Sequence, residues 1–514
     1  MQPIIATFPI IIILILMVGY RWGAARAGAA GYLAALVISI AFFGAAAEVL
    51  AYAHTKAILL AFDVLFIIWA AYLLYRVSDE AGAIQVIGDA LRQLTSDKGM
   101  QAILIGWIFA SFLQGTGGFG VPVAVTAPLL VGLGFSPLSA VVIPTIGHGW
   151  AVTFGSLGSS FNALISTTGL DASYLAPASA AFLGLATLPV GLMVVHAADG
   201  WGAVKRLGWK VVIIGGVMGG TQYLAAATLG LWNIGSFVGG LAGLIVGVPL
   251  AHWDETSPNS GAKTEKKPLF LALSAYLILI FFTVGILLIP STFVPELKQA
   301  LGSISIKVSF PETVTSLGYI TPAGTNKPIP LFTHAGAILL YTSAAAFVIY
   351  KRAGLYAAGT GRKILSETAR KMMTSSLSIA LMVAMALVMQ QAGMTEALAQ
   401  GLASAVGQTF PFASAWIGAL GAFMTGSNTN SNVVFAALQL RTAELLGYSV
   451  PIILAAQTAG ASLGSVLAPA KLIVGASTAG MEGKEGIVLR AVIGYGGGLI
   501  LFISLLTILT ITLF

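Results

Sequence analysis

The sequence predicts an all-α polytopic membrane protein with about 12–14 transmembrane segments, including two inverted repeats that contain broken or re-entrant helices. Three observations support this fold class. The 514 residues are 57% hydrophobic and only 8% charged, with a mean hydropathy of +0.94. Apolar runs of membrane-spanning length recur along the whole chain. Two further apolar stretches are interrupted at matching places by glycine and polar residues.

The composition excludes several classes of protein. A soluble domain carries about a quarter charged residues, far more than this chain. A soluble enzyme, a disordered protein and a nucleic-acid reader are therefore excluded, and the lack of cysteine excludes a disulfide-stapled secreted domain. The net charge of +7 is explained by basic residues in cytoplasmic loops, which set the orientation of membrane proteins.

A spanning helix needs about 20 apolar residues. The clean candidates are 3–20, 28–46, 57–75, 175–197, 211–229, 233–250, 269–290, 333–350, 374–394 and 487–513. The stretches 101–170 and 398–480 are apolar but broken by Gly, Pro, Ser, Thr and Asn.

Basic residues predict the orientation. No basic residue precedes the first run, so it does not resemble a cleaved signal peptide. Arg21 and Arg26 follow it directly, which places the N-terminus outside. The basic clusters within 76–100, 205–210, 263–267, 351–371 and 484–490 then all fall inside. We expect a multi-pass protein of the inner cell membrane with both termini outside.

Four regions follow from this topology. We expect N-terminal scaffold helices over 1–100 and a first inverted repeat, part of the transport core, over 101–200. Central scaffold helices occupy 201–373, with a cytoplasmic loop at 252–267 and an extracellular segment at 291–332 that could include short strands. The second inverted repeat occupies 374–514.

Two smaller patterns belong to the scaffold prediction. Residues 81–94 form an amphipathic segment too short to span, which we expect along the inner interface. Gly235, Gly239, Gly243 and Gly247 form a four-residue stripe that lets another helix approach closely, within the scaffold or between subunits.

The two broken stretches align with each other. Phe112-Leu-Gln-Gly115 matches Phe423-Met-Thr-Gly426, and Thr145-Ile-Gly147 matches Thr458-Ala-Gly460. The first copy is entered from the inside and the second from the outside, so their topologies are opposite. Inverted repeats with interrupted helices are typical of secondary transporters, with the binding site near the midplane. The alternative is that both breaks are ordinary glycine kinks.

The breaks offer chemistry for a small anion. One reads Gln114-Gly-Thr-Gly-Gly-Phe-Gly120, and the other Thr425-Gly-Ser-Asn-Thr-Asn-Ser-Asn432. Helices that begin there present free N–H groups and a positive dipole end to a carboxylate. Unwound carbonyl groups would suit Na⁺. Residues 115–120 match G-x-G-x-x-G, but no strand–helix unit surrounds them, so we reject a dinucleotide site.

Charges inside the membrane are costly unless they serve a function. Asp63 is interpreted as a structural partner of a polar group. His148 is either a site residue or a satisfied core histidine. Lys471 follows a proline in the second repeat, which favours a site role over snorkelling to the interface.

The sequence resembles the bacterial L-lactate/glycolate permease family of the ion-transporter superfamily. The matching stretches are 112–138, 151–160, 423–439 and the Gly-Lys-Glu of 483–485. The resemblance implies uptake of 2-hydroxymonocarboxylates by cation symport, an elevator motion and a Ser-Asn-Thr tip at Ser427-Asn428-Thr429.

The chain departs from that family at several positions. The resemblance implies an acidic residue at the positions of Gln114 and Asn428, a Pro-Gln pair at Pro469-Ala470, and a neutral residue at Lys471. These exchanges leave the coupling ion and the exact substrate open. A Lys471 that is neutral in the empty site would bind a proton and the anion together, giving symport. A Lys471 that stays charged would leave facilitated diffusion.

We therefore predict a secondary active permease for L-lactate, glycolate or another 2-hydroxy acid, with H⁺ preferred to Na⁺ as coupling ion. The alternatives are an uncoupled anion uniporter or channel, or a carrier for a different organic anion. An enzyme is disfavoured, because the sequence has no cysteine, no metal-spaced histidines and no Ser/His/Asp set. We expect no cofactor, metal or nucleic-acid partner, and the prediction allows a homodimer.

We expect the substrate to bind where the two breaks face each other across one central cavity. The predicted binding residues are Gln114, Gly115, Thr116, Gly117, Gly118, His148, Ser427, Asn428, Thr429, Asn430 and Lys471, with Lys471 and His148 also carrying the coupling proton.

Overall fold

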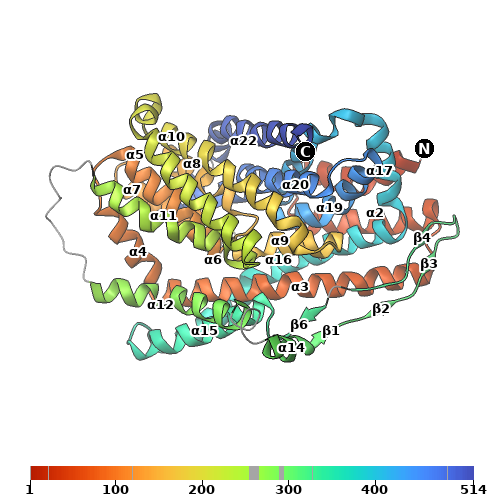
Figure 1. The fold of residues 1–514 in the computed structure, drawn as a ribbon, viewed down its shortest axis with the longest axis horizontal. Helices are drawn as coiled ribbons and strands as arrows, with labels where there is room; N and C mark the ends of the chain where they lie inside the picture. Colours follow the sequence, from red (N-terminus) through yellow and green to blue (C-terminus); the bar gives the residue numbers. More distant parts are fainter. Residues whose placement is uncertain are drawn as a thin grey trace.

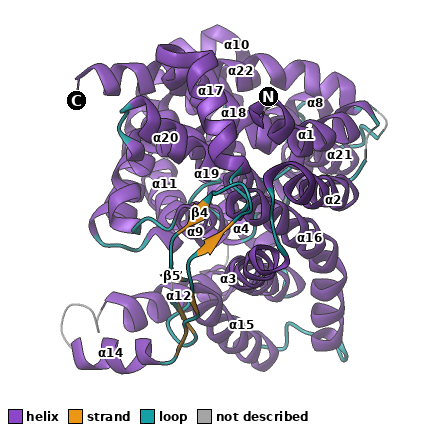
Figure 2. Cartoon of the chain, turned by 90° about the vertical axis from the view of Figure 1, so that its right-hand side faces the viewer, coloured by secondary structure: helices purple, strands orange, loops and turns teal. Residues whose placement is uncertain are grey.

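The computed structural model describes residues 2–20, 22–118, 120–253, 266–288, 295–326, 328–482 and 484–513. Helices make up almost all of it, and strands occur only in one arm of the described chain (Figure 1, Figure 2). Ten helical stretches in these residues are long and apolar enough to cross a membrane. The predicted all-α membrane fold is confirmed. Outside the described residues lie Arg21, most of the predicted loop 252–267, residues 291–294, Lys327 and Gly483.

The N-terminal region forms four helices. They are α1 (Gln2–Leu14, extended by the π-helical η1, Ile15–Gly19), α2 (Ala24–Phe43), α3 (Ala47–Glu80) and α4 (Ala83–Arg92). The long α3 packs against α15 and α16. Helix α4 buries Ile84, Ile87 and Leu91 on one face, which confirms that this segment is amphipathic.

The first predicted repeat is a series of helices separated by breaks. Its elements are α5 (Lys98–Gln101), η2 (Ala102–Phe109), α6 (Ala110–Thr116), α7 (Val121–Gly132), α8 (Pro137–Gly147), η3 (Gly149–Ala151), η4 (Ser156–Gly158), α9 (Ser159–Thr168) and α10 (Ala172–Tyr223). Helix α10 contains the two spans expected at 175–197 and 211–229. They are separated by a non-helical turn at Asp199 and Gly200, where the glycine has φ +70°.

The central region combines helices with a narrow arm. Its helices are η5 (Leu224–Thr228), η6 (Trp232–Ile234), α11 (Gly235–His252), α12 (Lys266–Thr283), η7 (Val284–Leu288), α14 (Pro295–Ser303), α15 (Ala335–Arg352) and α16 (Thr360–Gln391). Helix α16 packs mainly against α2 and α3.

The arm contains the short strands that the sequence allowed. Antiparallel pairs join β1 (Ser305–Ile306) to β6 (Ile329–Pro330), β2 (Ser309–Phe310) to β5 (Gly324–Thr325), and β3 (Thr313–Val314) to β4 (Ile320–Thr321). The arm lies along α3 (Figure 1). At its tip the Ser316 N–H donates to the Gly44 carbonyl at 2.9 Å.

From its break onward, the second predicted repeat resembles the first in the order of its elements. It consists of α17 (Met394–Val406), η8 (Gly407–Thr409), α18 (Phe410–Thr425), α19 (Asn428–Leu446), α20 (Val450–Gly464), η9 (Ser465–Leu467), α21 (Pro469–Thr478) and α22 (Glu485–Leu513). In both copies a helix breaks, two helices follow, and a 3₁₀ turn precedes a short helix and a long one.

One packing contact also recurs in the two copies. A Cβ on Gly147 would lie 2.1 Å from the Gly106 carbonyl oxygen, and a Cβ on Gly460 would lie 2.1 Å from that of Ala415. Each glycine thus allows two helices of its own copy to touch backbone to backbone. The inverted relation of the two copies stays a prediction.

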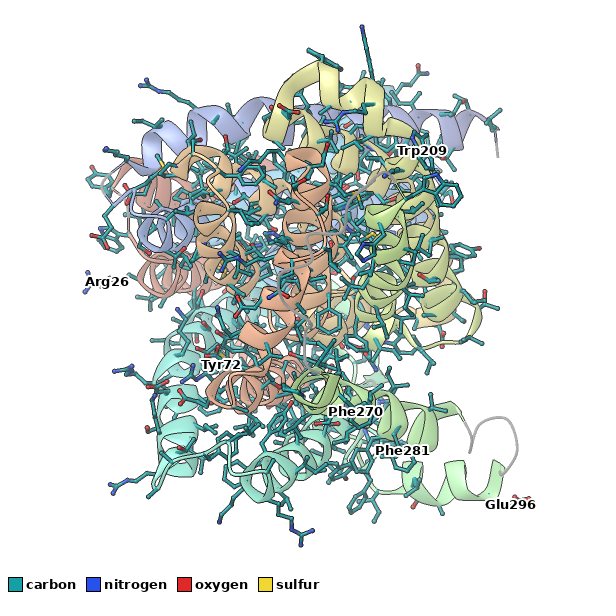
Figure 3. All side chains as sticks on the ribbon, turned by 90° about the vertical axis from the view of Figure 1, so that its left-hand side faces the viewer. Arg26, Tyr72, Trp209, Phe270, Phe281 and Glu296 are labelled. Atoms are coloured by element: carbon teal, nitrogen blue, oxygen red, sulfur yellow. The ribbon has the colours of Figure 1, made fainter. Side chains whose placement is uncertain are left out.

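The glycine stripe of α11 packs inside the chain. A Cβ on Gly239 would lie 2.9 Å from the Met218 carbonyl oxygen of α10, and one on Gly240 would lie 2.6 Å from the Cα of Phe112 in α6. Outward faces of other helices carry large apolar side chains, including Phe270 and Phe281 of α12 (Figure 3). Such exposed apolar faces fit a lipid environment.

Candidate functional site

The first break is shaped by two glycines with positive φ. Helix α6 ends at Thr116, Gly118 has φ +47° and Gly120 has φ +88°. Helix α7 begins directly afterwards, with Pro122 in its first turn. A Cβ on Gly118 would lie 1.9 Å from Ser156 Oγ, so only glycine fits there.

The other predicted residues of this break have different surroundings. Gly115 packs against α11, where a Cβ would lie 2.5 Å from the Cα of Phe237. Thr116 Oγ1 donates to the Leu113 carbonyl within its own helix. Gln114 is buried, and its Oε1 has no hydrogen-bond partner in the described structure. Gly117 has an ordinary φ of −119° and lies near Tyr75.

A strained turn faces the first break. Ser156 and Leu157 have φ of +45° and +53°, the only positive values for non-glycine residues in the described chain. Such a conformation costs about 1–3 kcal/mol and is found mainly at functional sites. The turn lies against Gln114, because a Cβ on Gly155 would lie 2.8 Å from Gln114 Nε2.

The second break begins helix α19. Ser427 caps this helix, and its Oγ accepts from the Asn430 N–H at 3.3 Å. Asn428 Nδ2 donates to Thr153 Oγ1 at 2.9 Å. Thr429 Oγ1 lies 3.0 Å from Ser160 Oγ, within hydrogen-bond distance.

The two breaks therefore meet at one segment, residues 153–160. Gln114 and Gly118 lie against Gly155 and Ser156, and Asn428 bonds to Thr153 on the same segment. Sequence reasoning missed Thr153 and Ser160 as site residues. The sequence feature that could have identified them is the run Gly155-Ser-Leu-Gly158. It lies between Thr153 and Ser160 and is another glycine break in the first repeat.

His148 and Lys471 are both buried. His148 Nδ1–H donates to the Pro144 carbonyl at 2.6 Å, and Nε2 has no partner among the described residues. Lys471 is only 8% exposed, and its Nζ donates to Ser465 Oγ at 2.9 Å. Burial within the protein favours a site role over snorkelling, and the role of Lys471 stays a prediction.

A cavity of about 500 Å³ joins part of the predicted site to neighbouring helices. Of the predicted residues it contains Ser427, Asn430 and Lys471, whereas Gln114, Gly118 and His148 do not line it. Arg26 of α2 and Lys371 of α16 also line this cavity. None of the described residues that line it is an aspartate or a glutamate. This electrostatic surrounding suits an anion.

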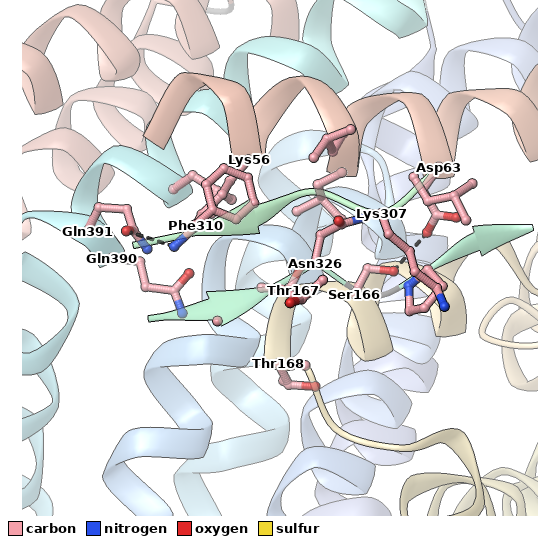
Figure 4. A pocket seen from close by; sticks show the side chains of 18 residues that line it. Lys56, Asp63, Ser166, Thr167, Thr168, Lys307, Phe310, Asn326, Gln390 and Gln391 are labelled. Carbon is pink, nitrogen blue, oxygen red and sulfur yellow. Dashed lines mark hydrogen bonds between the residues drawn. The ribbon is translucent and has the colours of Figure 1, made fainter. Parts of the chain in front are cut away.

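A larger cavity of about 790 Å³ lies between α3, the arm and α9 (Figure 4). Asp63 on its wall accepts from Ser166 Oγ at 2.8 Å and lies 2.9 Å from His334 Nε2. Lys56 Nζ donates to Gln391 Oε1 at 3.0 Å. Asp63 thus has the polar partners expected of a structural residue.

Comparison with known proteins decides the family. The family model described as L-lactate permease matches residues 2–514. The chain belongs to the L-lactate permease family. It is 28% identical to the glycolate permease GlcA of Escherichia coli (strain K12), over 99% of this chain and 95% of that protein. It is also 28% identical to the L-lactate permease of Bacillus subtilis (strain 168), over 96% and 92%.

A solved structure shares the fold of this permease. The YdaH transporter of Alcanivorax borkumensis aligns with a TM-score of 0.51 and 15% identity, over 90% of this chain and 88% of that one. The family match over residues 2–514 confirms the family resemblance seen in the sequence. With its apolar helices, the chain is a multi-pass membrane transport protein rather than an enzyme.

Proposed function

We propose that this permease is a secondary active transporter of a small monocarboxylate such as L-lactate, glycolate or another 2-hydroxy acid. Relatives that align over almost the whole chain are named as permeases for glycolate and L-lactate. The observation that carries the proposal is the meeting of two interrupted helices at a buried polar segment beside a basic cavity. Transporters bind substrates at such sites.

The carboxylate would bind at the beginning of α19, beside Lys471. The positive dipole end of α19, which begins at Asn428, favours a negative charge. Lys471 Nζ can donate three hydrogen bonds, and one of them is made to Ser465. The lysine would offset the carboxylate charge, which is costly to bury unpaired.

Coupling would use a proton. Lys471 would bind a proton together with the anion, and His148 would accept a hydrogen bond or proton at its unpartnered Nε2. Sodium is the second candidate, supported by the buried, unpartnered side-chain oxygens of Gln114 and Asn428. An uncoupled carrier is the remaining alternative.

Access would alternate by an elevator motion of the two repeats against the scaffold, with both termini outside. The contact from Ser166 of α9 to Asp63 of α3 would then be one that changes during the cycle. A homodimer would supply a fixed scaffold for this motion.

Transport by purified protein in lipid vesicles tests the proposal. Labelled L-lactate and glycolate are offered under an inward proton gradient, an inward Na⁺ gradient, or neither, with the membrane potential clamped. Proton symport predicts accumulation only in the first condition. Accumulation under Na⁺ alone would favour sodium coupling, and equilibration in every condition would favour the uncoupled carrier. Absence of any monocarboxylate uptake would refute the function.

A further inference from the structure

Asn430 stands out among the buried polar residues of the second break. Its side chain is 3% exposed and belongs to the wall of the 500 Å³ cavity, together with Ser427 and Lys471. Its Oδ1 has no hydrogen-bond donor among the described residues. Its Nδ2 has one long contact, 3.4 Å to Ser378 Oγ of α16.

A buried amide oxygen without a donor is costly, and native structures rarely keep one without a reason. The same wall contains Lys471, a cation whose one side-chain hydrogen bond is made to Ser465 and which can donate further hydrogen bonds. The wall therefore combines a donor that suits a carboxylate with an acceptor, Asn430 Oδ1, that could accept a hydrogen bond from a hydroxyl group.

A 2-hydroxy acid carries these two groups on adjacent carbons. Its carboxylate can accept from Lys471, and its 2-hydroxyl can donate to Asn430 Oδ1. An unsubstituted acid of the same length would leave that oxygen unpaired. A site built to bind a substrate hydroxyl discriminates strongly against the analogue that lacks it.

We propose that Asn430 is the specificity-determining residue that recognises the 2-hydroxyl group of the substrate. This inference rests on the proposed function, because it assigns one part of the same monocarboxylate site. Ser378 acts as a positioning residue, since its Oγ accepts from the amide nitrogen at 3.4 Å and leaves the oxygen without a protein partner among the described residues.

The test compares acids that differ only in the hydroxyl group. Uptake of labelled L-lactate into vesicles is inhibited with L-lactate or propionate, and then with glycolate or acetate. The wild-type chain should prefer each hydroxy acid by about tenfold or more, as expected for one buried hydrogen bond and the unpaired acceptor it prevents. Equal inhibition within each pair overturns the inference without any mutant.

Variants then locate the preference. Asn430→Ala should lower the lactate-to-propionate ratio by about tenfold while the inhibition constant for propionate changes less than about twofold. Ser378→Ala keeps the acceptor but removes the contact that orients the amide, so it should lower the preference less than Asn430→Ala does. Asn432→Ala is the matched control: it lies on the same helix with an equally unpartnered Oδ1, but outside the cavity wall. This control should change both acids alike.

Each outcome is distinguishable. If Asn430→Ala weakens both acids equally, the residue is structural and the inference fails. The size-exclusion profile shows whether Asn430→Ala folds. If it does not, the wild-type comparison of acid pairs still decides whether a hydroxyl group is recognised. Asn430→Ser then supplies a shorter acceptor, which should keep part of the preference. If the wild-type chain transports no monocarboxylate, the proposed function fails. Transport without a hydroxyl preference refutes only the role of Asn430.

Discussion

Asn428 Nδ2 donates a hydrogen bond to Thr153 Oγ1 at 2.9 Å, across 275 positions of sequence. Both side chains are buried. The bond ties the beginning of α19 to the segment that also contacts the first break. Because Thr153 Oγ1 in turn donates to the Thr458 carbonyl at 3.1 Å, one hydroxyl group links three parts of the predicted core.

Replacing Thr153 by valine should impair both folding and transport. The change keeps the shape but removes the acceptor of Asn428, leaving a buried amide unpaired at a cost of about 1–3 kcal/mol. We expect at least about fivefold lower uptake per folded molecule. Thr145→Val is the control, because Thr145 Oγ1 bonds only within its own helix, to Val141. Equal effects of the two changes would contradict a role in the site.

Alanine substitutions at two neighbouring glycines of the first break should differ in their effect on stability. Gly118→Ala places a Cβ against Ser156 Oγ at positive φ, which costs about 1–2 kcal/mol before the clash. Gly117→Ala meets only an ordinary 3.5 Å contact at Tyr75 and should be tolerated. Thermal unfolding measures both. Adding Ser156→Ala removes the clashing oxygen but keeps the strained backbone of a non-glycine residue at that position, so the double variant should recover part of the loss; no recovery would argue against this contact.

Lys471→Gln should abolish most substrate binding. Losing one hydrogen bond from a charged group costs about 1.5–3 kcal/mol, which lowers the affinity for lactate roughly ten- to a hundredfold. Binding is measured by substrate-dependent thermal stabilisation. Lys484→Gln, an exposed residue near the start of α22, is the control and should behave as wild type. Near-normal transport by Lys471→Gln would refute both charge models of the site.

His148→Ala should reduce uptake more than it reduces the amount of folded protein. The ring is buried and has one free nitrogen, which a site role would use and a purely structural role would not. Uptake is normalised to the amount of protein recovered in the monodisperse peak. His148→Asn retains a side chain that can bond to the Pro144 carbonyl and should restore folding, though not the proton chemistry. Parallel loss of uptake and protein would make His148 a core histidine.

Local composition predicts part of the fold. The breaks at Gly115–Gly120 and Gly426 were recognisable because glycine interrupts an apolar run there. The split of α10 was also predicted, as two apolar spans separated by basic residues. Ser427, Asn430 and Lys471 line one cavity, but the first break does not, so the prediction of a central cavity between the two breaks stays a prediction. The sequence also did not indicate the close contact of Gly115 with α11.

The strained turn could not have been predicted in this way. Ser156 and Leu157 are not residues that favour positive φ, so nothing local predicts their conformation. Tertiary packing imposes it, through neighbours such as Gly118 that are distant in sequence. For the same reason Thr153 and Ser160 were missed: their partners in α19 become visible only in three dimensions.

The packing of α11 restricts how two copies of this chain could assemble. Its glycine-rich side is filled by α10 and its neighbouring side by α6, so a symmetric dimer cannot form through this close-contact stripe without unpacking the subunit. Helix α2, in contrast, turns Leu33, Val37 and Ile40 outward, each more than half exposed. Mutations that probe subunit association therefore belong on outward rows such as this one, and substitutions in the α11 stripe would report on monomer folding instead.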